Sequence, residues 1–250
     1  MMTVLAALLT LIIGYLIGSN MTAVKIAKSR SRDIRECGSG NAGSTNVLRT
    51  FGWKWGLICL FFDSLKGAIS VGIGMFIGWA ALRLFPDVKF IDDLSMFLGC
   101  VGMLGAAIGH LLPLFYKFRG GKCVAVALGG FLVLAPIELL IALAVAIILI
   151  AITRMVSVGS IVGTILVAVL VIIKNFGNIP LMATAVIVAA IVIVAHLPNI
   201  QRIMEGRERR LDKIEWEKKL EKIELKQAKK AEKAERKQDE AEESDAAEEK

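Results

Sequence analysis

Polar segments that contain glycine interrupt an otherwise apolar sequence, and their residue types suit the binding of an anion. The first, GSGNAGSTNVLR at 38–49, has glycines that let consecutive backbone N–H groups converge, together with hydroxyl and amide side chains. Its last residue, Arg49, carries a planar guanidinium that can meet two phosphate oxygens at once. The segment therefore predicts a phosphate-binding loop followed by a cation.

Residues 38–43 also match the pattern G-x-G-x-x-G, and Asp63 follows twenty residues later. In dinucleotide-binding proteins this pattern follows a β-strand and opens a βαβ unit. Here a basic loop precedes it and an apolar helix follows. The pattern therefore does not indicate a dinucleotide site.

A second anion-binding signal lies in GHLLPLFYKFRGGKCVA at 109–125. Gly120 and Gly121 free the backbone just before a predicted helix, where unsatisfied N–H groups attract an anion, and Lys122 adds a compact positive charge. The segment is not a Walker A motif, because the preceding glycine is missing and Cys123 replaces the magnesium-binding hydroxyl. Lys122 is predicted to bind phosphate. The alternative, a basic anchor at the membrane surface, explains Lys117 and Arg119 better than it explains the Gly-Gly-Lys sequence.

Two further segments carry polar side chains. DSLKG at 63–67 places Asp63 and Lys66 on one helical face inside an apolar run, which indicates either a structural ion pair or substrate contact. Hydroxyls follow the predicted helix at about 137–152, at Ser157 among others, and the segment HLPNIQRIMEGRERR at 196–210 follows the last apolar run. Two histidines without a carboxylate cluster predict no metal site.

Long apolar stretches must position these segments. Of 250 residues, 56% are hydrophobic, and several runs reach the length of about 20 residues that crosses a bilayer. The fourth run contains Pro136 and Glu138 and reads as two short helices, about 123–135 and 137–152. The sequence thus predicts an all-α, polytopic transmembrane bundle of about seven spans. The six runs lie at about 3–24, 55–82, 94–112, 122–152, 155–173 and 180–196.

Lysine and arginine set the expected orientation, because they accumulate in cytoplasmic loops. The loops at 25–35 and 113–122 are basic, whereas the loop at 83–93 balances two bases with three aspartates. Seven spans then place the N-terminus outside and the C-terminus in the cytoplasm. The first run has no basic residues before it and no cleavage site, so it is expected to remain as a helix rather than act as a signal peptide.

The predicted domains are a transmembrane domain at 1–204 and a charged cytoplasmic tail at 205–250. The tail is rich in Glu, Lys, Arg and Ala and is expected to be helical or disordered. The four cysteines lack CxxC spacing and indicate neither a zinc site nor a disulfide framework.

Taken in order, the segments resemble the bacterial acyl-phosphate:glycerol-3-phosphate acyltransferase family, the integral membrane PlsY type. The resemblance covers about 1–210 and rests on GSGNAGSTNVLR, DSLKG, GHLLPLFYKFRGGK, TRMVSVGSI and HLPNIQRIMEGRE. It implies transfer of an acyl group from acyl phosphate to the sn-1 hydroxyl of glycerol 3-phosphate, without a cofactor. It also implies an active site that faces the cytoplasm from the bacterial inner membrane.

By this resemblance, a loop cradles acyl phosphate through Ser39, Gly40, Asn41, Gly43, Thr45 and Asn46. Glycerol 3-phosphate is expected among Arg49, Lys122, Ser157, His196 and Asn199, with Gly120 and Gly121 beside them. Arg49, Lys122 and His196 are the predicted catalytic residues. The family's glycine after GGK is Cys123 here, which would matter if that position needs a positive φ.

The expected partners are acyl phosphate, glycerol 3-phosphate and membrane lipid, and no nucleic acid. Acyl phosphate is already activated, so the site needs chiefly to hold two anions together. The proton of the attacking glycerol hydroxyl then passes either to the donor's own phosphate or to His196.

A transporter or channel for a phosphorylated solute is the alternative class of protein, and a non-catalytic lipid-binding scaffold is a third.

Overall fold

The computed structural model describes residues 1–86 and 91–211, and every regular element in that part of the chain is a helix. This confirms the predicted all-α class for the described residues. Those up to Glu208 form one compact unit, which is described here by itself. In chain order the elements are α1 (Met2–Gly18), α2 (Thr22–Lys28), α3 (Ser44–Phe51), α4 (Trp53–Leu84), α5 (Leu94–Leu111), the 3-10 turn η1 (Leu114–Tyr116), α6 (Val124–Leu134), α7 (Pro136–Thr153), α8 (Val156–Lys174), α9 (Ile179–Ala195) and α10 (Leu197–Met204).

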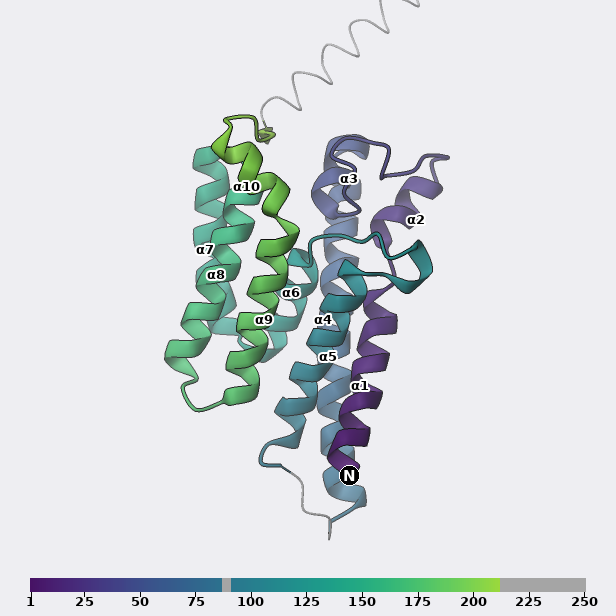
Figure 1. The fold of residues 1–250 in the computed structure, drawn as a ribbon, viewed down its shortest axis with the longest axis vertical. Helices are drawn as coiled ribbons and strands as arrows, with labels where there is room; N and C mark the ends of the chain where they lie inside the picture. The colour runs from purple at the N-terminus through teal and green to yellow at the C-terminus, as the bar shows by residue number, and fades with distance from the viewer. Residues whose placement is uncertain (87–90, 212–250) are drawn as a thin grey trace, which may run out of the picture. The chain divides into compact units, whose positions relative to one another are not determined.

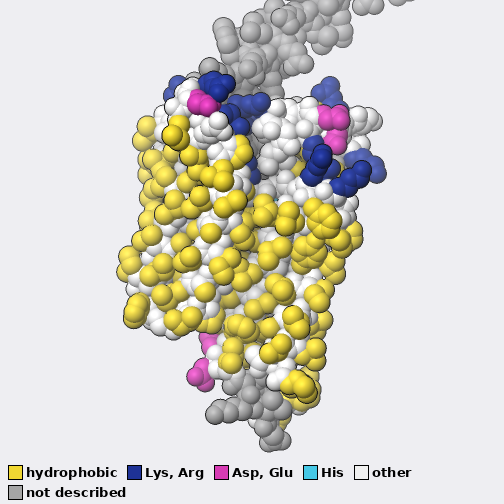
Figure 2. Space-filling view, viewed as in Figure 1, with side chains coloured by type: hydrophobic (Ala, Val, Ile, Leu, Met, Phe, Trp, Pro, Cys, Tyr) yellow, Lys and Arg dark blue, Asp and Glu magenta, His cyan; other side chains and the backbone are white. Residues whose placement is uncertain are grey.

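The long apolar helices run side by side, while α2, α3 and α10 gather toward one end of the unit (Figure 1). This end is called the polar end below. Hydrophobic side chains cover the visible flank of the bundle, and most of the Lys and Arg side chains in view lie toward the polar end (Figure 2). A helical bundle with an apolar flank satisfies its backbone hydrogen bonds internally and buries the flank in lipid, as an integral membrane protein must.

Five segments among the described residues are long and apolar enough to cross a membrane, and the bent pair α9 and α10 makes a sixth. The remaining apolar helix, α6, has 11 residues and spans only about 17 Å. Seven spans therefore stay a prediction, with α6 as the short member. The predicted break is confirmed, because α6 ends at Leu134 and Pro136 is the first residue of α7.

Glu138 lies in the first turn of α7, at the end of the bundle opposite the polar end. Its Oε1 accepts a hydrogen bond of 2.9 Å from Asn175 Nδ2 and lies 3.5 Å from Lys174 Nζ. These partners come from the end of α8, so the carboxylate joins two helices. The contacts explain how an acidic residue is tolerated in an apolar segment.

Small residues let α6 pack closely against α4. A Cβ atom added to Gly129 would lie 1.7 Å from the backbone oxygen of Ser64, so only glycine fits there. The same holds between α1 and α5, where a Cβ on Gly18 would lie 2.2 Å from the Ala106 oxygen. The start of α6 is therefore held firmly beside α4, which matters for the residues just before it.

The segment after α9 turns sharply before the chain leaves the bundle. The axes of α9 and α10 differ by 56°, with His196 at the bend and Pro198 in the first turn of α10. The compact unit extends to Glu208, four residues beyond the predicted boundary at 204. Most of the predicted tail, 212–250, lies outside the described residues.

Candidate active site

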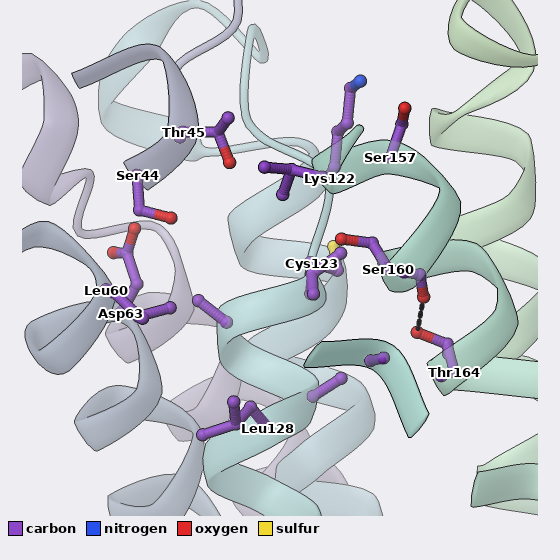
Figure 3. A pocket seen from close by; sticks show the side chains of 18 of the residues that line it. Ser44, Thr45, Leu60, Asp63, Lys122, Cys123, Leu128, Ser157, Ser160 and Thr164 are labelled. Atoms are coloured by element: carbon purple, nitrogen blue, oxygen red, sulfur yellow. Dashed lines mark hydrogen bonds between the residues drawn. The ribbon is translucent and has the colours of Figure 1, made fainter. Parts of the chain in front are cut away.

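A cavity of about 320 Å³ brings most of the predicted site residues together. In Figure 3, Ser44 and Thr45 lie on one side and Ser157 and Ser160 on the other, with Lys122 and Cys123 between them. Gly40, Gly120 and Gly121 are not among the lining residues. Ten predicted residues line the cavity: Ser39, Asn41, Gly43, Thr45, Asn46, Arg49, Lys122, Ser157, His196 and Asn199.

The loop at 38–43 is held in shape by the amide of Asn46. Asn46 Oδ1 accepts a 2.8 Å hydrogen bond from the Ser39 N–H, and its Nδ2 donates to the backbone oxygens of Ile34 and Cys37 at 3.0 and 2.9 Å. Gly38 and Gly40 adopt positive φ values of 54° and 72°. The buried amide of Asn46 thus fixes the conformation of the loop.

Helix α3 begins directly after this loop, and its first residues, Ser44 and Thr45, line the cavity. No side chain caps the helix at Gly43. The first N–H groups of α3 and its positive dipole end therefore stand at the cavity edge, where they favour an anion. Arg49, half buried in the second turn of α3, adds a full positive charge to the same wall.

Gly120 and Gly121 pack against the end of α5. The Gly121 N–H donates a 3.0 Å hydrogen bond to the His110 oxygen, and a Cβ on Gly120 would lie 2.0 Å from that same oxygen. The two glycines are therefore required for close backbone approach. They deliver Lys122 to the cavity, where its Nζ donates a hydrogen bond to Asn199 Oδ1.

Glu208, for which the sequence indicated no role, organises the opposite wall. Its Oε1 accepts hydrogen bonds from Ser157 Oγ at 2.8 Å and Asn199 Nδ2 at 2.7 Å, and its Oε2 accepts one from Arg202 Nε at 2.9 Å. Burial alone would raise the pKa of Glu208, but these hydrogen bonds and the Arg202 charge lower it below the ordinary value. The carboxylate stays ionised and joins the start of α8 to α10.

The surroundings of Lys122 destabilise the charged form of its side chain. Burial lowers the pKa of its ammonium group to about 8; the Glu208 carboxylate opposes the shift, while the Arg202 and Arg49 charges add to it. An ammonium group that is destabilised in this way is stabilised again when an anion binds beside it. The cavity therefore concentrates positive charge that a bound phosphate would satisfy.

His196 sits at the bend between α9 and α10 and is only 3% exposed. Its Nδ1 lies 2.8 Å from the Val192 backbone oxygen. A carbonyl oxygen only accepts, so Nδ1 carries the proton and Nε2 of the neutral ring carries a lone pair. This tautomer leaves Nε2 able to accept a proton or a hydrogen bond.

The cavity continues past these polar groups into an apolar arm between α6, α7 and α8. Its deepest lining residues on those helices are Phe131, Leu139 and Val167, which are all buried in the main hydrophobic core. Along α8 the lining extends from Val156 to Val167, about 16 Å at the helical rise. An apolar arm of this length suits a hydrocarbon chain.

Cys123 precedes α6 with a φ of 62°, the left-handed conformation that favours glycine. The position thus does need a positive φ. Its side chain is fully buried, and the thiol donates a 3.1 Å hydrogen bond to the Ala107 backbone oxygen. These contacts offset part of the backbone strain.

Comparisons with known proteins agree with this architecture. A family model described as glycerol-3-phosphate acyltransferase matches residues 8–206. The glycerol-3-phosphate acyltransferase of Thermus thermophilus is 38% identical over 208 residues, which are 82% of this chain and 96% of the relative.

Two solved structures of the integral membrane glycerol 3-phosphate acyltransferase PlsY share the fold at 33% identity. The glycerol 3-phosphate form has a TM-score of 0.71 and covers 82% of this chain and 95% of its own. The lysophosphatidic acid form has a TM-score of 0.68, with 82% and 94% covered. Given the family model, the similar relative and the shared fold, this chain belongs to the glycerol-3-phosphate acyltransferase family of integral membrane enzymes.

Proposed function

We propose that this enzyme transfers a fatty acyl group from acyl phosphate to the sn-1 hydroxyl of glycerol 3-phosphate, giving lysophosphatidic acid and phosphate. The observation that carries the proposal is a single cavity with a cationic end and an apolar arm. The related PlsY structures hold glycerol 3-phosphate and lysophosphatidic acid, an acceptor and a product of such a transfer.

The loop at 39–46 and the start of α3 are proposed to hold the phosphate of the donor, whose acyl chain follows the apolar arm. Glycerol 3-phosphate is proposed to bind among Arg49, Lys122 and the wall formed by Ser157, His196 and Asn199. The proximity of Asn199 and Lys122 supports a shared binding site. Arg49 and Lys122 would then neutralise two phosphates held side by side.

The donor explains why the site needs no covalent intermediate. Acyl phosphate is a mixed anhydride, so the glycerol hydroxyl attacks its carbonyl carbon, a C–O ester bond forms, and the bond to phosphate breaks. Phosphate leaves with the bonding electrons, and the hydroxyl proton passes either to that phosphate or to His196 Nε2. In keeping with this, Ser157 donates its hydroxyl hydrogen bond to Glu208 rather than to a histidine.

We infer that the polar end faces the cytoplasm of the bacterial inner membrane. Lys and Arg gather there, as the positive-inside rule requires. This orientation gives the phosphorylated substrate an aqueous approach and places the apolar arm within the bilayer. A transporter would instead place its binding site near mid-membrane, reachable from both ends.

The test is product analysis with purified protein and acyl phosphate. We expect phosphate and lysophosphatidic acid in equal amounts, and only when glycerol 3-phosphate is present. An acceptor analogue without the sn-1 hydroxyl should be inactive, whereas one without the sn-2 hydroxyl should react. Turnover with acyl-CoA but not with acyl phosphate, or passage of glycerol 3-phosphate into vesicles without acylation, would overturn the proposal.

The lowered pKa of Lys122 predicts how the reaction depends on pH. The ammonium form binds anions and is lost as pH rises through about 8. We therefore expect kcat/KM for glycerol 3-phosphate to fall about tenfold per pH unit above this value. In Lys122→Arg the decline should disappear, because a guanidinium stays protonated, although overall activity is lower. A wild-type rate that stays constant up to about pH 10 would contradict this role, because an ammonium group with the lowered pKa would be neutral there.

The apolar arm predicts control of acyl-chain length. Ala142, buried on α7, lines the arm beside the closely packed α8. A phenylalanine there should block the deep end, so Ala142→Phe should lower kcat/KM for palmitoyl phosphate about tenfold relative to octanoyl phosphate, through lost burial of methylene groups.

Ile148→Phe is the matched control for this variant. Ile148 lies on the same helix but is 57% exposed, and it is not among the residues that line the cavity. Its substitution should leave the ratio between the two donors unchanged. Equal losses for both donors in Ala142→Phe would mean that the arm does not hold the chain.

A further inference from the structure

Lys66, on α4, is buried next to Asp63 and His110, which line the cavity, and it has three acceptors around its ammonium group. Its Nζ lies 2.9 Å from Asp63 Oδ1, 2.8 Å from the Asn20 backbone oxygen and 2.8 Å from His110 Nδ1. Lys66, Asp63 and His110 are 6%, 0% and 2% exposed. An ammonium group has three N–H donors, so these contacts use all of them.

This arrangement fixes the proton on His110. Because Lys66 can only donate, Nδ1 of His110 must accept, and the neutral ring carries its hydrogen on Nε2. Asp63 balances the lysine charge and also accepts a 2.9 Å hydrogen bond from Thr22 Oγ1. The cluster thus connects the α1–α2 junction, α4 and α5 at one point.

The opposite edge of the His110 ring faces the phosphate-binding segments. A Cβ on Gly121 would lie 2.3 Å from His110 Nε2 and 3.0 Å from the Ala42 oxygen, so the ring edge fills the space beside this glycine. The His110 backbone oxygen also accepts a hydrogen bond from the Gly121 N–H. Ring and backbone of one residue therefore hold the segment that ends in Lys122, next to the loop that contains Ala42.

We propose that His110, held as the neutral Nε2–H tautomer by Lys66, is a positioning residue that aligns the Gly120–Lys122 segment with the 38–43 loop. This deepens the proposed function, because it rests on Lys122 as a phosphate-binding cation. It also gives the buried ion pair a purpose. A buried ion pair that serves stability alone can often be replaced by apolar groups. The His110 tautomer, in contrast, depends on the Lys66 ammonium group as a hydrogen-bond donor.

The experiment compares Asp63→Asn/Lys66→Met with the wild type. The double variant removes both charges at nearly constant volume, so the fold should persist, as checked by thermal unfolding in detergent. We expect kcat/KM for glycerol 3-phosphate to fall about ten- to a hundredfold, mostly through KM, because Lys122 is displaced. Ser70→Ala is the matched control. Ser70 is buried on the same helix and its hydroxyl donates to the Lys66 backbone oxygen, so the activity of this variant should stay near that of the wild type.

Nitrogen NMR of labelled histidine provides a readout that does not depend on turnover. The chain has two histidines, and the structure assigns them opposite tautomers, Nδ1–H in His196 and Nε2–H in His110. We expect both neutral tautomers in the wild type and loss of the fixed Nε2–H signal in the double variant. His110→Asn, which keeps an acceptor for Lys66 but has no group beside Gly121, should remain folded and show the raised KM.

Three results would overturn the proposal: two Nδ1–H signals in the wild type, wild-type kinetics in the folded double variant, or wild-type kinetics in His110→Asn. Failure of the proposed function would look different. In that case the tautomer signals would appear as expected, while Lys122→Ala would bind and turn over glycerol 3-phosphate normally.

Discussion

Replacing Lys122 with alanine should lower kcat/KM for glycerol 3-phosphate by about 2–4 kcal/mol in transition-state stabilisation, about thirty- to a thousandfold. The ammonium group lies in a partly dehydrated cavity, beside Asn199 and near the Glu208 carboxylate. Charge-assisted hydrogen bonds to phosphate are strong in such surroundings. Lys122→Arg keeps the charge but enlarges the group beside Gly121, so it too should be slow.

The measurement is steady-state kinetics against both substrates on folded, membrane-inserted protein. Lys117→Ala is the control, because Lys117 is an exposed cation in the same connection and does not line the cavity. It should retain nearly full activity. If Lys122→Ala behaved like the control, the charge would serve only to anchor the loop at the membrane surface.

Replacing Arg49 should be about as damaging, and the type of replacement separates charge from geometry. A guanidinium meets two phosphate oxygens with two parallel N–H bonds, whereas an ammonium acts as a point charge. Arg49→Lys should therefore lose nearly as much kcat/KM as Arg49→Ala, about thirty- to a thousandfold in both. The residue projects from α3, whose first N–H groups face the same cavity.

Lys54→Ala serves as the comparison for Arg49, since it removes an exposed cation from the start of the next helix. It should leave the rate within about twofold, as expected for a surface charge. A near-normal rate in Arg49→Lys would show that Arg49 supplies charge without bidentate recognition. A near-normal rate in Arg49→Ala would remove it from the substrate site altogether.

Much of the fold follows from residues with strong physical preferences. Pro136 cannot continue a helix, so the break between α6 and α7 was predictable to within about two residues. The number of spans was harder to fix. Composition shows that the stretch beginning at Val124 is apolar, but whether an 11-residue helix crosses the bilayer depends on how its neighbours surround it.

The structure brings most of the predicted site residues together, whereas their roles in binding and catalysis stay predictions. Arg49, Lys122, His196 and Asn199 line one cavity, as their chemistry indicated. Gly120 and Gly121 instead pack against α5, because glycine in a sequence signals backbone freedom without showing whether a ligand or another helix uses it. Asn46 is similar, since its amide is directed into its own loop.

Glu208 was given no role from the sequence, although it is the last residue of the segment HLPNIQRIMEGRE on which the resemblance rests. It stands in a stretch of alternating charges that resembles a solvated helix, and only the bend at His196 brings it back over Ser157. His110 was missed for a related reason. A lone histidine in an apolar segment gives no indication of its tautomer until the neighbours of its ring are known, and Lys66 lies 44 residues away.

Cys123 gives the enzyme a chemical reporter next to Lys122. The thiol is fully buried and bonded to the Ala107 oxygen, and it occupies a backbone conformation that a glycine would adopt more readily. We expect an alkylating reagent to react slowly with such a thiol, because the segment around it must open before the reagent can reach the sulfur. We therefore expect the rate of alkylation to report how often this segment opens, and a phosphate bound at Lys122, as proposed above, to slow the reaction.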